Sequence, residues 1–255
     1  SVGLGVMGLH SFFQQKNVPF GSVMSKVWNQ KIFKHIQENA DQASVKLAEE
    51  RGPCPDAEEF GIKERFSNKT AIAPTASISV ICGGASPGIE PIAANSYTHK
   101  TLSGSFNVRN KYLAKILDKY GKNDDETWSS ITTNQGSVSH LDFLTDLEKD
   151  TFKTAFEIDQ RWIVELGADR TPNISQAQSI NVFVPADIHK KELHQIHFQA
   201  WKKGLKSLYY CRSKSIQRAE NVNTGSSTDV TKNVYKNNKE STNEENKYEE
   251  CLSCQ

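Results

Sequence analysis

The sequence has no apolar run long enough to span a membrane, and its N-terminus does not have the pattern of a secretory signal. Charge of either sign is not in excess, because 31 Lys and Arg residues face 30 Asp and Glu residues and the formal net charge is +1. This balance gives no electrostatic basis for binding nucleic acid or a membrane surface. The 255 residues are enough for one large domain or two small ones with a sizeable core.

Cysteine is scarce, and its count is odd. The five cysteines are Cys54, Cys82, Cys211, Cys251 and Cys254. An odd number in a chain of this length is not typical of a secreted disulfide framework, so we expect a reducing cytoplasmic compartment. The first three show no partner pattern, and buried free thiols are the expectation for them.

The segment Gly3-Leu-Gly-Val-Met-Gly8 matches the dinucleotide-binding spacing G-x-G-x-x-G, but its context is absent. That site requires a preceding strand and an acidic residue about twenty positions further on. Here only two residues precede Gly3, and Val23 stands where the acid is needed. We therefore interpret these small residues as allowing helices to pack closely.

Helices are predicted from apolar spacing and stop signals. Residues 22 to about 51 form the longest, with Ser22 as N-cap and Gly52-Pro53 as its end. Its predicted apolar stripe comprises Met24, Trp28, Ile32, Ile36, Ala40, Ala43 and Leu47. Further helices are expected at residues 112–120, about 146–167 and 186–203. The last has one apolar face and Gly204 after its end, the face being Leu193, Ile196, Ala200 and Trp201.

The helix at 186–203 lies between two predicted strands, at residues 179–184 and 205–211. A strand, a helix and a strand at this spacing indicate a parallel pair and an α/β fold. Active-site groups in such folds lie at the C-terminal ends of strands, and Tyr209 and Tyr210 are expected at such an end. Another short strand is expected at the start of residues 70–82, followed by a turn at Pro74 and a second element from near Ser77.

Composition divides the chain into three parts. Asn, Ser, Thr, Lys and Glu dominate from about Asn221 to Glu250, and such a segment cannot offset its ordering entropy by burial. We predict a folded domain over residues 1–220, a flexible linker over 221–250 and a dithiol tail over 251–255. A coil of roughly thirty residues has an end-to-end distance of about 30 Å, enough to reach both a buried site and an outside partner.

Cys251-Leu-Ser-Cys254 has three interpretations. A mobile thiol shuttle fits best, because exposed vicinal thiols exchange readily with an internal disulfide. A thioredoxin-type site requires the pair at a helix N-terminus after a strand, which the predicted tail does not supply. Half of a zinc site is the third, and histidines would then supply the remaining ligands, namely His189, His194 and His197.

Two other motifs have a structural and a functional interpretation. The turn Pro74-Thr-Ala-Ser-Ile78 either begins an ordinary helix or presents free backbone N–H groups to a phosphate. The pair Tyr209-Tyr210 would by itself indicate packing in a strand. Together with a terminal dithiol, it indicates radical chemistry in which two neighbouring tyrosines pass a one-electron hole.

These motifs occur in an order that resembles a known family. They are Leu-Gly-Val-Met-Gly near the start, Ala73-Pro-Thr-Ala-Ser77, Gly88-Ile-Glu-Pro91, Lys206-Ser-Leu-Tyr-Tyr210 and the terminal Cys-x-x-Cys. Over nearly the whole chain they resemble the C-terminal third of the large (alpha) subunit of class I ribonucleotide reductase. The resemblance implies the second half of a ten-stranded α/β barrel, followed by a disordered C-terminal redox tail.

The resemblance also implies roles. The substrate diphosphate would be held by Pro74, Thr75, Ala76, Ser77 and Ile78. Tyr209 and Tyr210 would relay the radical from a small partner subunit that carries a dinuclear metal/radical cofactor, and no cofactor is expected in this chain. Cys251 and Cys254 would re-reduce the active-site disulfide and be recharged by thioredoxin or glutaredoxin.

Family residues upstream of Ser1 are not in this sequence. They include the thiyl-radical cysteine with its flanking Asn and Glu, both active-site redox cysteines and the allosteric nucleotide domain. The absence of an initial Met also suggests a processed product, a fragment or one piece of a split protein. We therefore expect the chain alone to be inactive and to need the N-terminal part of the large subunit. A non-catalytic binding or regulatory fragment is the alternative.

Overall fold

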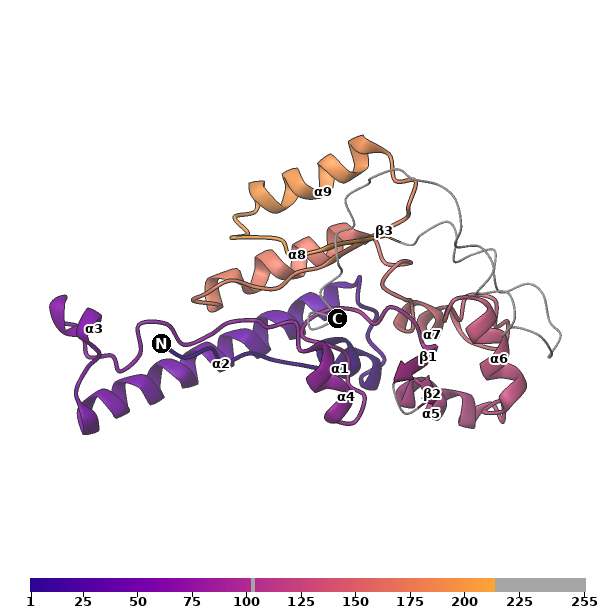
Figure 1. Ribbon diagram of the computed structural model, residues 1–255, viewed down its shortest axis with the longest axis horizontal. Coiled ribbons are helices and arrows are strands. Elements are labelled where there is room, and N and C mark those ends of the chain that lie inside the picture. The colour runs from indigo at the N-terminus through magenta and orange to yellow at the C-terminus, as the bar shows by residue number, and fades with distance from the viewer. Residues whose placement is uncertain (102–103, 214–255) are drawn as a thin grey trace, which may run out of the picture. The chain divides into compact units, whose positions relative to one another are not determined.

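The computed structural model of the protein describes residues 1–101 and 104–213 (Figure 1). The first elements are α1 Leu9–Gln15, α2 Val23–Arg51, α3 Pro55–Glu59, α4 Ala76–Ile81, β1 Ser96–Thr101 and β2 Gly104–Arg109. The helices α5 Lys111–Lys119, α6 Asp125–Thr133, α7 Asp146–Thr151 and α8 Gln160–Arg170 follow. A short 3-10 turn at Thr171–Asn173 leads to β3 Val182–Val184, α9 Lys190–Lys202 and β4 Cys211–Ser213.

Four extended segments run parallel and form the frame of the fold. Leu4 bridges Thr70, and Ile72 bridges Gln178. The third segment continues into β3, which pairs with β4 so that Val182 lies opposite Cys211. Helices connect these segments along the chain, so the predicted α/β class is confirmed. The described residues form an open row, with Leu4 in one outer segment and β4 as the other.

The prediction of the longest helix was correct in its bounds and correct in part for its apolar face, because Trp28 and Ile32 pack half-buried against the core. Ser22 accepts the N–H of Ser25 and completes a capping box, and Gly52 follows the last turn with φ 79°. Met24, on the predicted stripe, is 53% exposed. The buried side chains lie one position further along and are Ser25, Asn29, Phe33, Ser44 and Ala48. Polar contacts decide this face, because the Asn29 amide donates to the Leu166 carbonyl of α8 at 2.9 Å.

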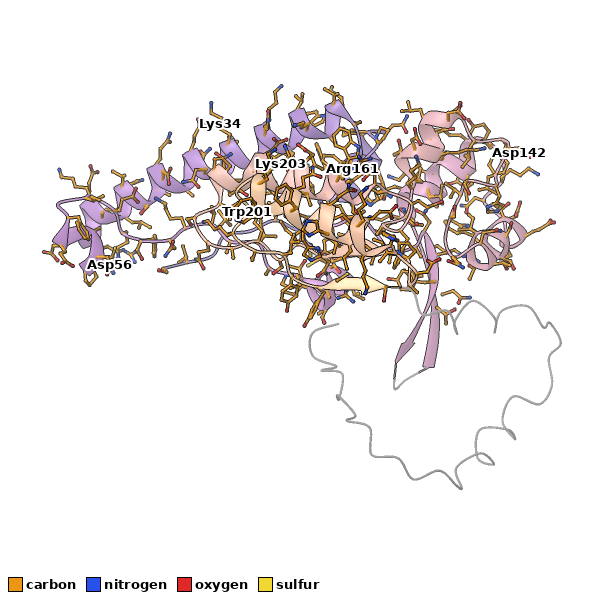
Figure 2. All side chains as sticks on the ribbon, turned by 90° about the horizontal axis from the view of Figure 1, so that it is seen from above. Lys34, Asp56, Asp142, Arg161, Trp201 and Lys203 are labelled. Carbon is orange, nitrogen blue, oxygen red and sulfur yellow. The ribbon has the colours of Figure 1, made fainter. Side chains whose placement is uncertain are left out.

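The strand–helix–strand unit forms as predicted, with shifted boundaries. The helix α9 starts only at Lys190, because the His189 side chain caps it, and Gly204 follows it with φ 76°. Trp201, labelled in Figure 2, is 73% exposed and therefore does not belong to the buried face, where Ile196 and Ala200 lie. Residues 205–210 are not part of a strand, which begins only at Cys211.

The single helix predicted at 146–167 was wrong. The chain forms α7, then a non-helical stretch, then α8. Thr154 donates its N–H and its hydroxyl to Glu157, and Ala155 donates its N–H to the Ile92 carbonyl. These bonds replace helical ones, and Asp159 then caps α8. The apolar spacing of this region is that of two helices packed in different cores.

The interior has several apolar clusters. The largest lies among α1, α2 and α8 and includes Phe13, Phe20 and Phe33. A second belongs to the small helical region formed by α5, α6 and α7 and includes Leu113, Trp128 and Phe152. The β1–β2 hairpin, which the sequence did not predict, pairs Ser96 with Arg109 and precedes this region.

Gly5 shows what the glycines near the N-terminus provide. A Cβ at Gly5 would lie 2.3 Å from the Ala71 carbonyl oxygen, so the absence of a side chain lets two extended segments meet. The interpretation as close helix packing was therefore wrong for this glycine. Gly8 is the N-cap of α1, with φ 81°.

Candidate functional site

Tyr209 and Tyr210 come directly before β4, so they lie at its beginning and not at the C-terminal end that was predicted. Their ring centroids are 4.2 Å apart, with an angle of 52° between the planes. Tyr209 is 44% exposed and Tyr210 is 41% exposed. The Arg212 guanidinium lies over the Tyr210 ring at 5.5 Å. The two rings are thus in contact with each other, beside a cation and open to one side.

A buried polar chain supports the tyrosines. The Tyr210 N–H donates to Asn181 Oδ1 at 2.9 Å. The N–H and the side-chain amide of Asn181 donate to the two carboxylate oxygens of Glu90, at 3.1 and 3.0 Å. Burial raises the pKa of Glu90, and the hydrogen bonds from Asn181 and the charges of Arg212 and Arg170 oppose that rise.

The turn at residues 74–78 has an uncommon backbone. Thr75 has φ 53°, a left-handed value that is strained for a β-branched residue. Its hydroxyl does not cap α4 but accepts the Gly88 N–H at 2.7 Å. Among the described residues, no acceptor contacts the N–H groups of Ala76, Ser77 and Ile78. Those groups are therefore available to a ligand.

The helix α4 also borders a cavity of about 430 Å³. Its lining includes Ser79, Tyr97 and Arg109. The buried Gln14 also lines it, and the amide nitrogen of Gln14 has no partner among the described residues.

His10 lies one helical turn before Gln14 and is fully buried. Burial lowers the pKa of His10 to about 3, and its Nδ1 accepts the Ile92 N–H, so the ring is neutral.

The three histidines of the zinc hypothesis make local contacts in the described part of the chain. His189 caps α9, the His197 ring bonds the Leu193 carbonyl, and the His194 ring stacks on Phe198. In the described part of the chain no group of three or more His, Cys, Asp and Glu residues is arranged to hold a metal ion. Cys251 and Cys254 lie outside the described residues, as do the predicted linker and tail.

The remaining thiols are free, as expected, but not buried. Cys54 is half-buried, whereas Cys82 and Cys211 are exposed. Cys82 directly follows the short α4, and Cys211 begins an outer strand. Among the helices of residues 1–101 and 104–213, none combines the length and the apolar character needed to cross a membrane.

Comparison with known proteins gives the family. The model described as ribonucleotide reductase, barrel domain, matches residues 1–61 and 56–211. The chain belongs to the ribonucleotide reductase family. It is 46% identical over 228 residues to the ribonucleoside-diphosphate reductase large subunit of Invertebrate iridescent virus 6, covering 88% of this chain and 24% of the relative. The large subunit of Invertebrate iridescent virus 3 is 42% identical over 231 residues, covering 89% of this chain and 36% of the relative.

A solved ribonucleotide reductase has the same fold. The class Id alpha subunit of Actinobacillus ureae superposes with a TM-score of 0.78 and 39% identity, covering 84% of this chain and 39% of that one. The chain therefore spans between about a quarter and two fifths of the length of these relatives. It corresponds to part of the barrel domain.

Within this ribonucleotide reductase segment, sequence analysis assigned no role to three residues that shape the site. Glu90 and Asn181 support the tyrosines, and Lys206 donates to three successive carbonyls, those of Ile174, Ser175 and Gln176. For Glu90, the available signal was its charge between two apolar neighbours, Ile89 and Pro91. Such a residue is either exposed or bound to a specific partner.

Proposed function

We propose that this chain is the C-terminal part of the catalytic barrel of a ribonucleoside-diphosphate reductase large subunit. The completed enzyme would reduce ribonucleoside diphosphates to deoxyribonucleoside diphosphates for DNA synthesis by radical chemistry. The observation that carries the proposal is 46% identity to a large subunit over 88% of this chain. Because the chain spans only part of its relatives, activity requires the upstream segment with the radical cysteine.

The row of four parallel segments supports the proposed half-barrel. In the part of the chain that the structure describes, the outer sides of the Leu4 segment and of β4 carry no ladder. An open sheet edge presents unpaired backbone groups, which native proteins usually cover or abolish by closing a barrel. We propose that the N-terminal part of the large subunit supplies the remaining strands and completes a ten-stranded barrel.

The proposed radical relay uses Tyr209 and Tyr210. A phenol that loses an electron also loses its proton, and a phenylalanine cannot do so at a comparable potential. The ring contact at 4.2 Å supports transfer between them, and their part-exposed position supports access from a partner. The partner would be a small subunit that carries a dinuclear metal/radical cofactor.

The proposed substrate contact is the turn of Pro74, Thr75, Ala76, Ser77 and Ile78. Three N–H groups without acceptors among the described residues support a diphosphate at this position. The Thr75 hydroxyl contributes indirectly, because its bond to Gly88 fixes the strained turn.

The proposed reductant is the terminal dithiol of Cys251 and Cys254. Each reduction removes the ribose 2′-hydroxyl as water and converts one active-site dithiol to a disulfide. The tail dithiol would return that disulfide to thiols by exchange, and thioredoxin or glutaredoxin would then reduce the tail. We also propose a cytoplasmic location, because the cytosol keeps thiols reduced.

The test uses the completed enzyme, with the small subunit and an excess of thioredoxin system. Tyr209→Phe and Tyr210→Phe should each abolish turnover, whereas Tyr120→Phe, at an exposed tyrosine bonded to Glu148, should not. Cys251→Ser should permit about one turnover and then stop. Sustained turnover by all three site variants would refute the proposal.

The alternative is a non-catalytic binding or regulatory fragment. The short span of this chain against its relatives is the observation that favours it. It predicts tight binding to reductase subunits without any restored turnover on reconstitution, and it predicts that the tyrosine substitutions have no effect on that binding.

A further inference from the structure

The contact between the tyrosine rings conflicts with regular strand geometry. Consecutive residues of a strand direct their side chains to opposite faces. Tyr209 and Tyr210 directly precede β4 and extend its backbone bonding to the segment that leads into β3, and they still bring their ring centroids to 4.2 Å. A local departure from the regular ladder must therefore allow the contact.

The backbone bonds locate this departure. In a regular parallel ladder, the N–H and the C=O of one residue bond to neighbours two apart on the adjacent strand. Here the N–H of Tyr209 donates to the Ile180 carbonyl at 2.8 Å, whereas the carbonyl of Tyr210 accepts the Val182 N–H at 2.9 Å. Two residues thus occupy the place of one, which is a β-bulge opposite Asn181.

A bulge leaves one N–H outside the ladder, and at this site that N–H belongs to Tyr210. Asn181 Oδ1 accepts it at 2.9 Å. The orientation of the Asn181 amide is fixed, because its nitrogen donates to Glu90 at 3.0 Å and a flipped amide would place oxygen against the carboxylate. Asn181 and Glu90 are 2% and 6% exposed, so water does not readily replace these bonds.

We propose that Glu90 and Asn181 are positioning residues for the radical relay. They hold the bulge that brings both tyrosine rings together. This inference rests on the proposed function for its catalytic consequence, but the geometry of the bulge does not. Breaking the hydrogen bonds that link Glu90, Asn181 and Tyr210 leaves the Tyr210 N–H without its side-chain acceptor. A regular strand pairing, which would separate the two rings, then becomes favoured.

The sharpest variant is Glu90→Gln, which preserves size. Its amide nitrogen would face the Asn181 amide nitrogen, so Asn181 turns to accept from it and withdraws its oxygen from Tyr210. The double variant Glu90→Gln/Asn181→Asp restores every bond, because the new amide donates to the new carboxylate and that carboxylate accepts the Tyr210 N–H. This exchange keeps the net charge of the pair.

The measurement is the ¹⁹F NMR shift of 3-fluorotyrosine placed at position 210 of the native full-length polypeptide. The ring current of residue 209 is read as the change in that shift on Tyr209→Leu. We expect this change in the parent protein, its loss with Glu90→Gln and with Asn181→Leu, and its return in the double variant. Thermal unfolding of each variant identifies any that does not fold.

The matched control is Gln160→Leu. Gln160 is a buried amide that accepts the Phe183 N–H of β3 at 2.7 Å, away from the bulge. It should lower stability without altering the ring-current change. If Gln160→Leu abolishes the change as Asn181→Leu does, or if Glu90→Gln leaves it intact in a folded protein, the inference is overturned.

Turnover gives the second readout. In an active enzyme, kcat should fall with Glu90→Gln and recover in the double variant, while KM for the ribonucleoside diphosphate stays the same. Full kcat despite a lost ring contact overturns the catalytic role. If the double variant restores the ring contact in a protein with no reductase activity, the bulge stands and the proposed function alone fails.

Discussion

The guanidinium of Arg170 lies over the ring of Phe33, with 5.5 Å between its ζ carbon and the ring centroid. Both side chains are fully buried between α2 and α8. Nε donates to Gln178 Oε1 at 2.5 Å and a terminal nitrogen donates to Asn29 Oδ1 at 3.1 Å. Burial lowers the pKa of Arg170 to about 9, so the group remains charged near neutral pH.

The buried hydrogen bonds of Arg170 should contribute to the stability of the fold. Asn29→Leu removes one acceptor and leaves the cation buried, which should cost about 1–3 kcal/mol of unfolding free energy. Arg170→Met leaves the buried side-chain oxygens of Gln178 and Asn29 without this donor, so we expect a loss at least as large. Urea unfolding of both variants checks this order, and a smaller loss with Arg170→Met would contradict it.

His10 should make the fold sensitive to mild acid. Its folded pKa, about 3, lies below the ordinary 6.5 of an unfolded histidine, so the unfolded state takes up a proton that the folded state refuses. The contribution of His10 to the unfolding free energy is therefore fully present above pH 6.5. It falls by up to about 1.4 kcal/mol per pH unit as the pH decreases toward 3.

His10→Asn provides the comparison, because its Oδ1 replaces Nδ1 as the acceptor of the Ile92 N–H. Between pH 6.5 and 5 the variant should lose less stability than the parent. Denaturant midpoints at several pH values measure the difference. Parallel curves for the two proteins would show that His10 does not cause the acid sensitivity.

Gly5→Ala should separate two of the parallel segments. The new Cβ would lie 2.3 Å from a backbone oxygen of Ala71, which cannot rotate away. We expect a loss of about 1–3 kcal/mol in unfolding free energy. Gly3→Ala is the matched control, because its Cβ would lie 3.3 Å from a Cβ atom, and thermal unfolding should rank it as much milder.

Thr75→Val should weaken substrate binding if the turn holds the diphosphate. It keeps the shape but removes the hydroxyl that accepts the Gly88 N–H at 2.7 Å. We expect KM in the completed enzyme to rise by roughly two- to tenfold, the value of one net hydrogen bond. Thr75→Ser retains the acceptor and should restore KM, whereas an equal rise in both variants would assign the effect to packing.

The sequence predicted elements whose limits are set locally. Ser22 and Gly52 bound α2 through a cap and a left-handed glycine, and Gly204 ends α9 in the same way. The elements that the sequence did not predict depend on contacts between residues far apart in the chain. The stretch between α7 and α8 is held by bonds such as Ala155 to Ile92, and no local periodicity encodes them.

The candidate site shows the same division. The tyrosine pair and the turn at Thr75 were chosen from their residue types, and the structure gives the ring contact and the free N–H groups. The position of the pair at the start of β4 was missed, because a bulge is not visible in the residue pattern. Glu90 was missed as a support because its partner, Asn181, lies 91 residues away.

The open row of parallel segments has a practical consequence for work with this chain. An outer strand with free backbone groups is a template for another strand, and native proteins usually cover or charge such edges. Among the described residues, β4 and the Leu4 segment have only one neighbour each. Purified in isolation, the chain should self-associate edge to edge, so co-expression with the segment that we propose to complete the barrel is the route to a well-behaved sample.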